Sequence, residues 1–232
     1  MDSLSQLALG AAVGVAAMGR RTAPWKAAAW GALCGTLPDL DVFIDHGDAL
    51  ANMVRHRAHS HALFWLTLLA PPLAWLIARL QRERALWPRW CLAVWLALVT
   101  HPLLDTMTVY GTQLAQPFSD HPYGVGSVFI IDPLYTLPLL IGLVLALAWQ
   151  RGRPARALGA NGLGLLLSTA YLAWGVAAQQ HVDTLARASL ARQGVQAQAL
   201  LVTPTPFNSL LWRVVATTPG QYHEGFSSLL DD

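Results

Sequence analysis

Residues 91–105 read CLAVWLALVTHPLLD, in which nine apolar residues and Thr100 are followed by His101 and, four residues later, by Asp105. Side chains at i and i+4 lie on one face of a helix, one turn apart. Ionisable groups at the edge of a bilayer are costly unless they are paired or bound to a metal. The stretch therefore predicts a helix that presents an imidazole and a carboxylate at its outer end, a pair suited to Zn²⁺ or Mn²⁺. A His–Asp hydrogen bond that locks two helices together is the alternative.

Other hydrophobic segments also begin or end with ionisable residues. These stretches are Pro38-Asp39-Leu40-Asp41, His56-Arg57-Ala58-His59-Ser60-His61, His121 and Asp132-Pro133. Histidine is the commonest metal ligand in proteins, and a group this dense is unusual. A guanidinium next to it, such as Arg57, can bind a phosphate oxygen bidentately. In a chain with 12% charged residues, this placement indicates a built site.

Each stretch also has an ordinary interpretation. Asp39 and Asp41 beside a proline are typical turn or cap residues, and an acid such as Asp132 is favoured at a helix N-terminus by the helix dipole. The three histidines at 56–61 are also compatible with a titrating cluster at the membrane interface. We favour a metal site because the Asp pair and the histidines occur together. The remaining histidines are expected to be bystanders: His46, His121, His181 and His223.

The composition indicates a polytopic membrane protein. The 232-residue chain is 54% hydrophobic and its mean hydropathy is +0.40. A soluble domain carries about twice as large a charged fraction, and apolar runs of about 17–25 residues can span a bilayer as helices. We expect an all-α fold with about six transmembrane helices in a bundle, at residues 3–19, 25–44, 60–80, 89–107, 129–149 and 157–178.

Basic residues predict the orientation of this bundle. Ten of the fifteen Lys and Arg residues follow the first, third and fifth segments, and the positive-inside rule places them in the cytoplasm. The His/Asp stretches and both termini are then expected on the outside, in the periplasm for a bacterial inner membrane. The ten residues are Arg20, Arg21, Lys26, Arg79, Arg82, Arg84, Arg89, Arg151, Arg153 and Arg156.

The chain changes character after residue 179. Residues 180–200 predict a polar helix, which Thr203-Pro204-Thr205-Pro206 ends, and residues 210–217 and 221–229 predict a β-hairpin. We therefore divide the chain into a transmembrane metal-site domain, 1–179, and a C-terminal extramembrane α/β segment, 180–232. An isolated hairpin is marginal in water. Either the segment docks on the helices or on a partner, or it is an incomplete domain that continues beyond Asp232.

Other chemistries find no support in the sequence. It contains no P-loop, no GxGxxG before a helix, no HExxH and no GxSxG. A net charge of +2 without a basic stripe argues against nucleic acid as a partner. Cys34 and Cys91 lie in apolar segments without CxxC spacing, so neither a disulfide framework nor a thiolate metal site is expected.

The order of the motifs resembles that of the YdjM-like membrane-bound metal-dependent hydrolases. The resemblance covers roughly residues 1–150 and rests on a glycine-rich first helix, Pro-Asp-x-Asp, His-Arg followed by Ser-His, His-x₃-Asp with Tyr-Gly-Thr-Gln, and Asp-Pro. A more distant likeness is to zinc-dependent phospholipase C. The resemblance implies that the metal ligands are Asp39, His61, His101 and Asp105, with Asp41, His56 and Asp132 close by and His59 outside the set.

The first hypothesis is an integral-membrane metallohydrolase with its active site at the outer face. One or two divalent ions, Zn²⁺ first and Mn²⁺ second, would activate water and polarise the scissile group. A site at headgroup depth favours a lipid or lipid-linked phosphoester as substrate. His56 is the candidate general acid or base, Asp41 orients a ligand and Arg57 neutralises a phosphate. The candidate metal residues are Asp39, His61, His101, Asp105 and Asp132.

Two other functions stay open at this point. A transporter or channel for divalent metals would need polar residues that continue through the bilayer on facing helices. An intramembrane metalloprotease would use the His-x₃-Asp pair within the bilayer, although the absence of HExxH counts against it. The sequence does not predict the oligomeric state.

Overall fold

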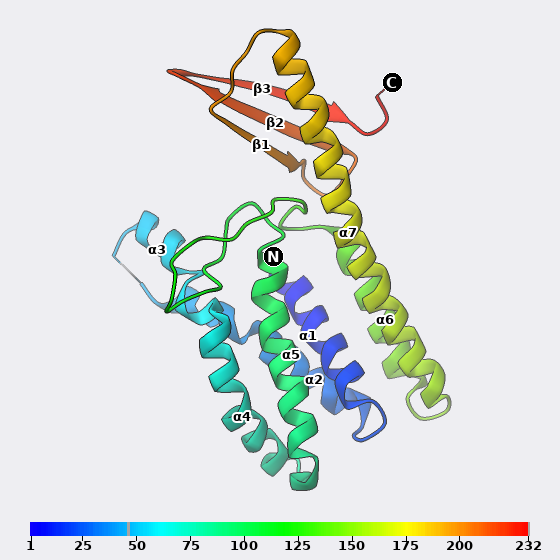
Figure 1. Ribbon diagram of the computed structural model, residues 1–232. Coiled ribbons are helices and arrows are strands. Elements are labelled where there is room, and N and C mark those ends of the chain that lie inside the picture. The colour runs from blue at the N-terminus through cyan, green and yellow to red at the C-terminus, as the bar shows by residue number, and fades with distance from the viewer. Residues whose placement is uncertain (46, 232) are drawn as a thin grey trace.

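The computed structural model describes residues 1–45 and 47–231, so His46 and Asp232 lie outside the described part of the chain. Figure 1 shows helices that lie side by side along one direction, with a small sheet beyond one end of them. The elements, in chain order, are α1 (Ser3–Met18), α2 (Pro24–Thr36), the 3-10 helix η1 (Leu37–Phe43), α3 (Ala49–Arg55), the 3-10 helix η2 (His59–His61), α4 (Leu63–Leu80), the 3-10 helix η3 (Arg84–Leu86), α5 (Trp87–Asp105), α6 (Pro133–Trp149), α7 (Pro154–Arg192), β1 (Ala199–Pro204), β2 (Leu211–Thr218) and β3 (Gln221–Ser228).

The long helices alternate in direction, which sorts their connections to two opposite ends. Helices α1, α4 and α6 start near the N-terminus of the chain and run away from it, and α2, α5 and α7 return (Figure 1). The segments 36–62 and 105–132 therefore gather at one end, which we call the site end. The ten basic residues of the predicted cytoplasmic loops lie at or beside the opposite turns, which we call the basic end.

The prediction of about six transmembrane helices is wrong. In the described part of the chain, two helices are long and apolar enough to cross a membrane, Leu63–Leu80 and Pro154–Arg192. With a rise of 1.5 Å per residue, the 16 residues of α1 and the 17 of α6 span only about 24–26 Å, less than a hydrocarbon core of about 30 Å. Helix α2 ends after 13 residues because the chain turns into η1 at Leu37. Helix α5 has 19 residues, but Arg89, His101 and Asp105 lower its hydropathy.

Helices α1 and α2 pack backbone to backbone through glycines. A Cβ atom on Gly31 would lie 2.2 Å from the carbonyl oxygen of Gly10, and one on Gly35 would lie 2.8 Å from the Cα of Gly10. Small residues permit such close helix approach. The contact fixes the C-terminal end of α2, where Gly35 lies, against the rest of the bundle.

Apolar side chains fill the space between these helices. One buried cluster joins α1, α2, α4 and α5, with Val15, Ile77, Trp90 and Leu98 among its members. A second cluster, which includes Tyr135 and Leu139 of α6, packs α1 against α6. Together they hold the end of α5 that carries His101 in one position relative to α1 and α2.

The C-terminal segment is a three-stranded antiparallel sheet in the order β1-β2-β3. Strands β2 and β3 occupy the residues of the expected hairpin, with Val214 opposite Gly225. Strand β1 was not predicted, because Thr203-Pro204-Thr205-Pro206 was interpreted as a break. Pro204 ends this strand, a position that costs no internal ladder hydrogen bond. Helix α7 runs without a break through residue 179, so a domain division at that residue stays a prediction.

The sheet packs against the helices, which was one of the alternatives expected for the C-terminal segment. Val202 and Trp212 pack against Ala178 and Val182 of α7. Gln179 Nε2 donates hydrogen bonds to the carbonyl oxygens of Val125 (2.7 Å) and Val202 (2.8 Å). The sheet is thereby tied to the loop 106–132 at the site end.

We expect Gly31→Ala to destabilise the protein by about 1–3 kcal/mol, since the added methyl meets backbone atoms that cannot move independently. The matched control is Gly162→Ala in α7, where a Cβ meets no atom within 4 Å and helix propensity improves by up to about 1 kcal/mol. Thermal unfolding in detergent measures both. Equal unfolding midpoints for Gly31→Ala and the wild type would contradict the backbone contact.

Candidate metal centre

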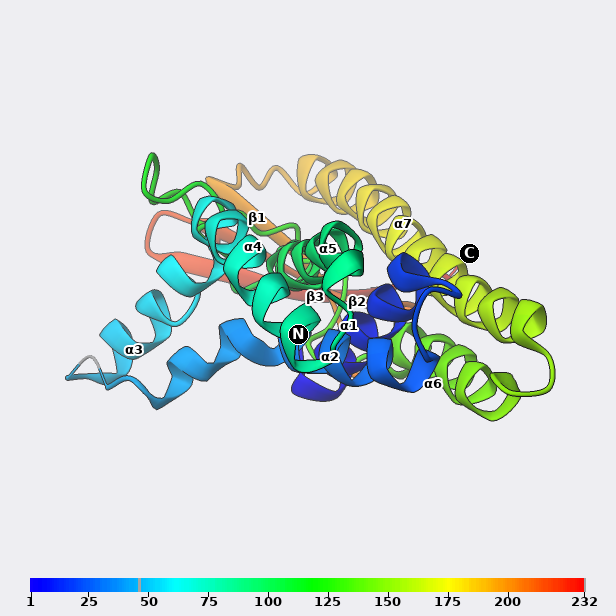
Figure 2. The same ribbon diagram turned by 90° about the horizontal axis from the view of Figure 1, so that it is seen from below.

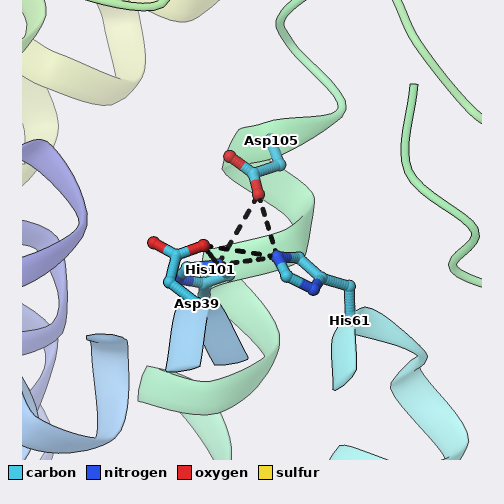
Figure 3. A group of neighbouring side chains, drawn as sticks. All are labelled: Asp39, His61, His101 and Asp105. Atoms are coloured by element: carbon cyan, nitrogen blue, oxygen red, sulfur yellow. Dashed lines mark hydrogen bonds and ion pairs between the residues drawn. The ribbon is translucent and has the colours of Figure 1, made fainter. Parts of the chain in front are cut away.

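Four side chains from three segments converge at the site end of the bundle. They are Asp39 of η1, His61 of η2, and His101 and Asp105 at the end of α5 (Figure 3). One ligand atom from each lies within 4.8 Å of the other three. His61, His101 and Asp105 are no more than 1% exposed, whereas the side chain of Asp39 is 24% exposed. Asp39 therefore faces the outside of an otherwise buried group.

Local structure explains how these residues meet. The spacing of His101 and Asp105 puts both on one face of α5, as the sequence predicted. Pro38 lies where the α-helical hydrogen-bond pattern of α2 gives way to the tighter η1, and this turn carries Asp39 over the end of α5. His61 ends η2, directly before α4 begins.

The distances between the ligand atoms fit a tetrahedral ion. The Nε2 atoms of His61 and His101 are 3.1 Å apart. Asp39 Oδ1 lies 3.5 Å from the first and 3.3 Å from the second. Asp105 Oδ2 lies 3.3 Å and 3.5 Å from the same two atoms. Four ligand atoms bound tetrahedrally to Zn²⁺ at 2.0–2.1 Å are separated by about 3.3–3.4 Å.

Hydrogen bonds behind the two imidazoles determine their tautomers. His101 Nδ1 lies 2.6 Å from the carbonyl oxygen of Gly35, which can only accept, so this nitrogen carries a proton. His61 Nδ1 lies 2.8 Å from Ser60 Oγ, whose own proton is donated to Asp41 Oδ2. Ser60 therefore accepts from His61. In both neutral rings Nε2 then carries a lone pair, as a metal ligand requires.

The centre of the group consequently needs positive charge. Two nitrogen lone pairs and two carboxylate oxygens face one another, and Asp105 Oδ2 makes no hydrogen bond although it is buried. Burial lowers the pKa of His61, but Asp105 and Asp39 outweigh this effect and raise it above its ordinary value. Burial likewise raises the pKa of Asp105, and the nearby imidazoles reverse the shift and hold it well below its usual range. A divalent cation satisfies all four atoms at once, so the residues fit a metal ion.

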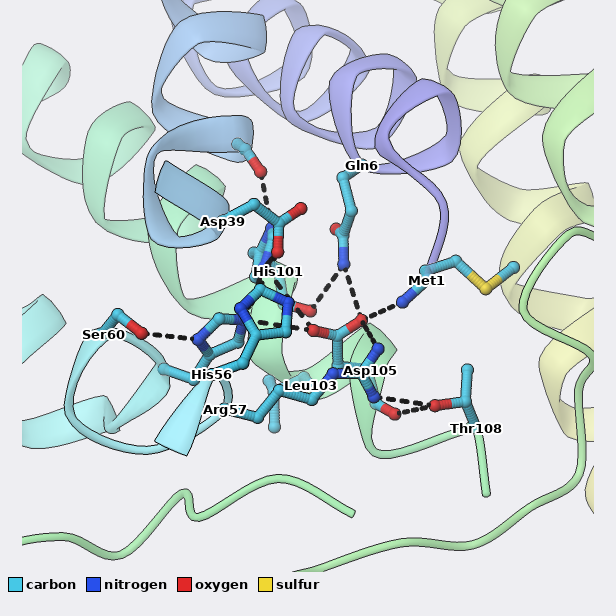
Figure 4. A network of polar contacts seen from close by, with 12 residues as sticks. Met1, Gln6, Asp39, His56, Arg57, Ser60, His101, Leu103, Asp105 and Thr108 are labelled. Carbon is cyan, nitrogen blue, oxygen red and sulfur yellow. Dashed lines mark hydrogen bonds and ion pairs between the residues drawn. The ribbon is translucent and has the colours of Figure 1, made fainter. Parts of the chain in front are cut away.

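Donors on the other side of Asp105 keep its free oxygen directed at the histidines. Its Oδ1 atom accepts a hydrogen bond from Gln6 Nε2 (3.1 Å) and contacts the amino group of Met1 (Figure 4). Arg57 Nη2 lies 3.6 Å from the same oxygen. Gln6 Nε2 also donates to the carbonyl oxygen of His101, at 3.2 Å. Asp105 is thus oriented to offer one oxygen, Oδ2, to an ion.

The three candidate catalytic residues lie beside this group. Asp41 Oδ1 lies 2.7 Å from His56 Nδ1, and Asp41 Oδ2 accepts the hydrogen bond of Ser60. Asp41 therefore links His56 to Ser60, which in turn contacts His61. Arg57 donates to Thr108 Oγ1 at 3.1 Å, and its guanidinium carbon lies 5.3 Å from the centre of the Tyr110 ring. These contacts hold the imidazole of His56 and the guanidinium in defined positions.

A cleft of about 370 Å³ opens next to the four ligands. Its lining includes Asp39, Val42, His56, Arg57 and Tyr110. Asp39 is the one residue of the four-ligand group that also lines this cleft. A small molecule in the cleft would therefore approach an ion from the side of Asp39. It would lie beside the guanidinium of Arg57 and the imidazole of His56.

Comparison with known proteins gives a family but no close relative. The family model described as YdjM inner membrane protein matches residues 1–182. The chain belongs to the YdjM inner membrane protein family. No curated protein and no solved structure matches it, and the comparisons do not show the likeness to phospholipase C.

The structure does not bring Asp132 into the four-ligand group. Its Oδ1 accepts from the backbone N–H of Leu134 (3.0 Å) and its Oδ2 from the Tyr171 hydroxyl (2.7 Å), so it caps α6. Burial raises its pKa. His59 lies outside the group too, lining a second cleft, and His121 contacts the ring of Tyr123 on the surface.

Sequence reasoning missed the residues that orient the ligands. Ser60, Gln6 and the carbonyl oxygen of Gly35 each hold one ligand through a hydrogen bond. A polar amide within the apolar segment 3–19 is a signal that could have identified Gln6. A backbone carbonyl leaves no such signal, because every residue has one.

We expect Ser60→Ala to weaken metal affinity about ten- to a hundredfold, because His61 loses the acceptor that fixes its tautomer. Isothermal titration with Zn²⁺ on detergent-purified protein measures this. Ser119→Ala, on the exposed loop, is the control and should bind like the wild type. Affinity in Ser60→Ala equal to that of the control would show that the Ser60 hydrogen bond does not orient a ligand.

Proposed function

We propose that this chain is a metal-dependent hydrolase of the inner membrane that cleaves a phosphoester in a lipid or lipid-linked substrate. One observation carries the proposal. Each of the two imidazole Nε2 atoms stands 3.1–3.5 Å from the other and from the two carboxylate oxygens, beside an open cleft. This donor set and spacing favour Zn²⁺ first and Mn²⁺ second. A bound ion would supply a water of lowered pKa and would polarise the scissile group.

The residues around the cleft have separate tasks in this proposal. His56, held by Asp41, exchanges a proton with the attacking water or with the leaving oxygen. Arg57, held by Thr108 and stacked on Tyr110, supplies positive charge for the phosphate oxygens. Asp41 contacts the imidazole of His56 and anchors His61 through Ser60, so it aligns both sides of the reaction centre.

The distribution of charge supports a site on the periplasmic side. The ten basic residues of the basic end lie opposite the metal centre, and the positive-inside rule assigns such residues to the cytoplasm. We propose that α4 and α7 cross the membrane, in opposite directions, between these two ends.

The surroundings of the site favour hydrolysis at one face over metal transport. In the described part of the chain, the interior directly beyond His101 along α5 consists of Leu98, Ala97, Val94 and Trp90. A transport pathway would require polar groups there. The metal centre instead ends at this apolar core and opens into the cleft at its own end of the bundle.

The first test is metal content by mass spectrometry on detergent-purified protein. We expect stoichiometric zinc or manganese in the wild type, and its loss in His101→Ala and in Asp105→Ala, because each variant removes a buried ligand. The matched control is Asp132→Asn, which retains the cap of α6 and should retain the metal. Full occupancy in His101→Ala and Asp105→Ala, with folding checked by circular dichroism, would refute the site.

The second test is catalysis. The metal-loaded wild type is expected to hydrolyse a phosphodiester such as bis(p-nitrophenyl) phosphate, and chelation or Asp105→Ala should lower the rate to background. His56→Ala should keep its metal and lose most of the rate, because His56 is not among the four ligands. A metal-loaded protein inactive on soluble and lipid phosphoesters alike would count against the hydrolase.

The third test concerns orientation. We expect a cysteine placed by Ser119→Cys, at the site end, to react in intact cells with a thiol reagent that cannot cross the inner membrane. A cysteine placed by Arg153→Cys, at the basic end, should react only after the cells are permeabilised. The opposite pattern would place the metal centre in the cytoplasm.

A further inference from the structure

The 3-10 helix η1 and the residue after it carry two chemically different sets of side chains. Asp39 and Asp41 are turned toward the metal centre, where one joins the four-ligand group and the other contacts His56 and Ser60. Apolar side chains lie exposed between and after them. These are Leu40 (53% exposed), Val42 (64%), Phe43 (83%) and Ile44 (57%), which we call the η1 ridge.

The segment that carries the η1 ridge stands out from the helix bundle. In Figures 1 and 2 the chain between α2 and α3 extends sideways, at the level where α4 begins. An exposed apolar ridge on a projecting segment marks a binding surface. A ridge of four residues is narrow for a stable protein–protein interface, which covers about 800 Å² on each partner, but it is large enough for insertion about 5–10 Å deep into a membrane surface.

The start of α4 indicates where the membrane surface lies. Only 28% of the apolar window of this candidate span is buried inside the protein, so most of its apolar side chains are free to face lipid. Its first turn carries Phe64 and Trp65, and the Phe118 ring lies 5.4 Å from that of Phe64. Aromatic residues gather at this depth of membrane proteins. Because His61 precedes Leu63 by two residues, the metal centre lies within about 7 Å of the beginning of the span along the chain.

We propose that the η1 ridge inserts into the membrane leaflet at the site end, and that the substrate enters the cleft from that leaflet. Val42 belongs both to the ridge and to the cleft wall. The hydrocarbon chains of a lipid phosphoester then stay beside Phe43, while its phosphate reaches Asp39 and Arg57. The natural substrate is thus a membrane lipid, and a soluble phosphoester serves only as a surrogate that reaches the cleft from water. The route of the substrate rests on the proposed function, whereas the insertion of the ridge does not.

Insertion is tested by spin labelling of the full chain in vesicles of phosphatidylethanolamine and phosphatidylglycerol. A nitroxide attached at Phe43→Cys, in a Cys91→Ala background, should collide more often with oxygen than with a water-soluble nickel chelate. A label at Leu230→Cys is the control, because Leu230 is similarly exposed (76%) and follows β3 in the C-terminal segment. Ile44→Cys provides a second ridge position should Phe43→Cys fold poorly. Ridge labels as accessible to the nickel chelate as the label at 230 would overturn the insertion.

The route of the substrate is tested by a ratio of two rates. We expect Phe43→Ser to lower hydrolysis of a vesicle lipid, relative to that of bis(p-nitrophenyl) phosphate, by about tenfold, since one large apolar side chain no longer enters the leaflet. Leu230→Ser should leave this ratio unchanged. An unchanged ratio in Phe43→Ser would overturn the lateral route. If the metal-loaded wild type cleaves neither substrate, the proposed function fails, and the spin labels still decide whether the ridge inserts.

Discussion

The candidate metal centre depends on two imidazole Nε2 atoms that face each other at 3.1 Å. Each ring is held from behind at Nδ1, His101 by the carbonyl oxygen of Gly35 and His61 by Ser60, so that Nε2 of each ring faces the centre of the group. Two buried or half-buried carboxylates complete the group. Such an arrangement is electrostatically unfavourable in a neutral interior unless a cation occupies its centre. The surrounding fold can be understood as the scaffold that keeps these four groups in place.

The scaffold acts through the glycine contact of α1 and α2. Because Gly10 and Gly31 touch through backbone atoms, the two helices are fixed at a distance that places Gly35 against His101 and Gln6 against Asp105. One close helix pair thus orients two ligands that both belong to a third helix, α5. This explains why the glycine-rich start of the chain, which looks weak as a pair of membrane spans, matters for the chemistry.

The sequence predicted the ligand group better than the fold around it. The i, i+4 spacing of His101 and Asp105 follows from helix geometry alone. Charged residues beside apolar segments indicated the Asp39/Asp41 pair and the histidines at 56–61, and the family resemblance implied Asp39 and His61 among them. Asp132 shares that local pattern, but its carboxylate caps α6 instead. Glycines and alanines lower the mean hydropathy of a membrane span and of a shorter buried helix alike, so hydropathy does not distinguish the two. For this reason about six spans were expected. Strand β1 was missed because Pro204 is a breaker inside a sheet but is tolerated at the end of a strand.

One short element, η1, carries both a candidate ligand and the apolar residues proposed to enter the membrane. A 3-10 helix places successive residues about 120° apart, so seven residues are enough to turn Asp39 toward the histidines, Asp41 toward His56, and Phe43 away from the protein. The ligand that lines the cleft and the side chain that would enter the lipid are therefore only four residues apart. Any displacement of η1 by a lipid that approaches along Phe43 must also move Asp39. Since the other three ligands are buried and held by hydrogen bonds, Asp39 is the ligand through which contact with the membrane would alter the metal centre.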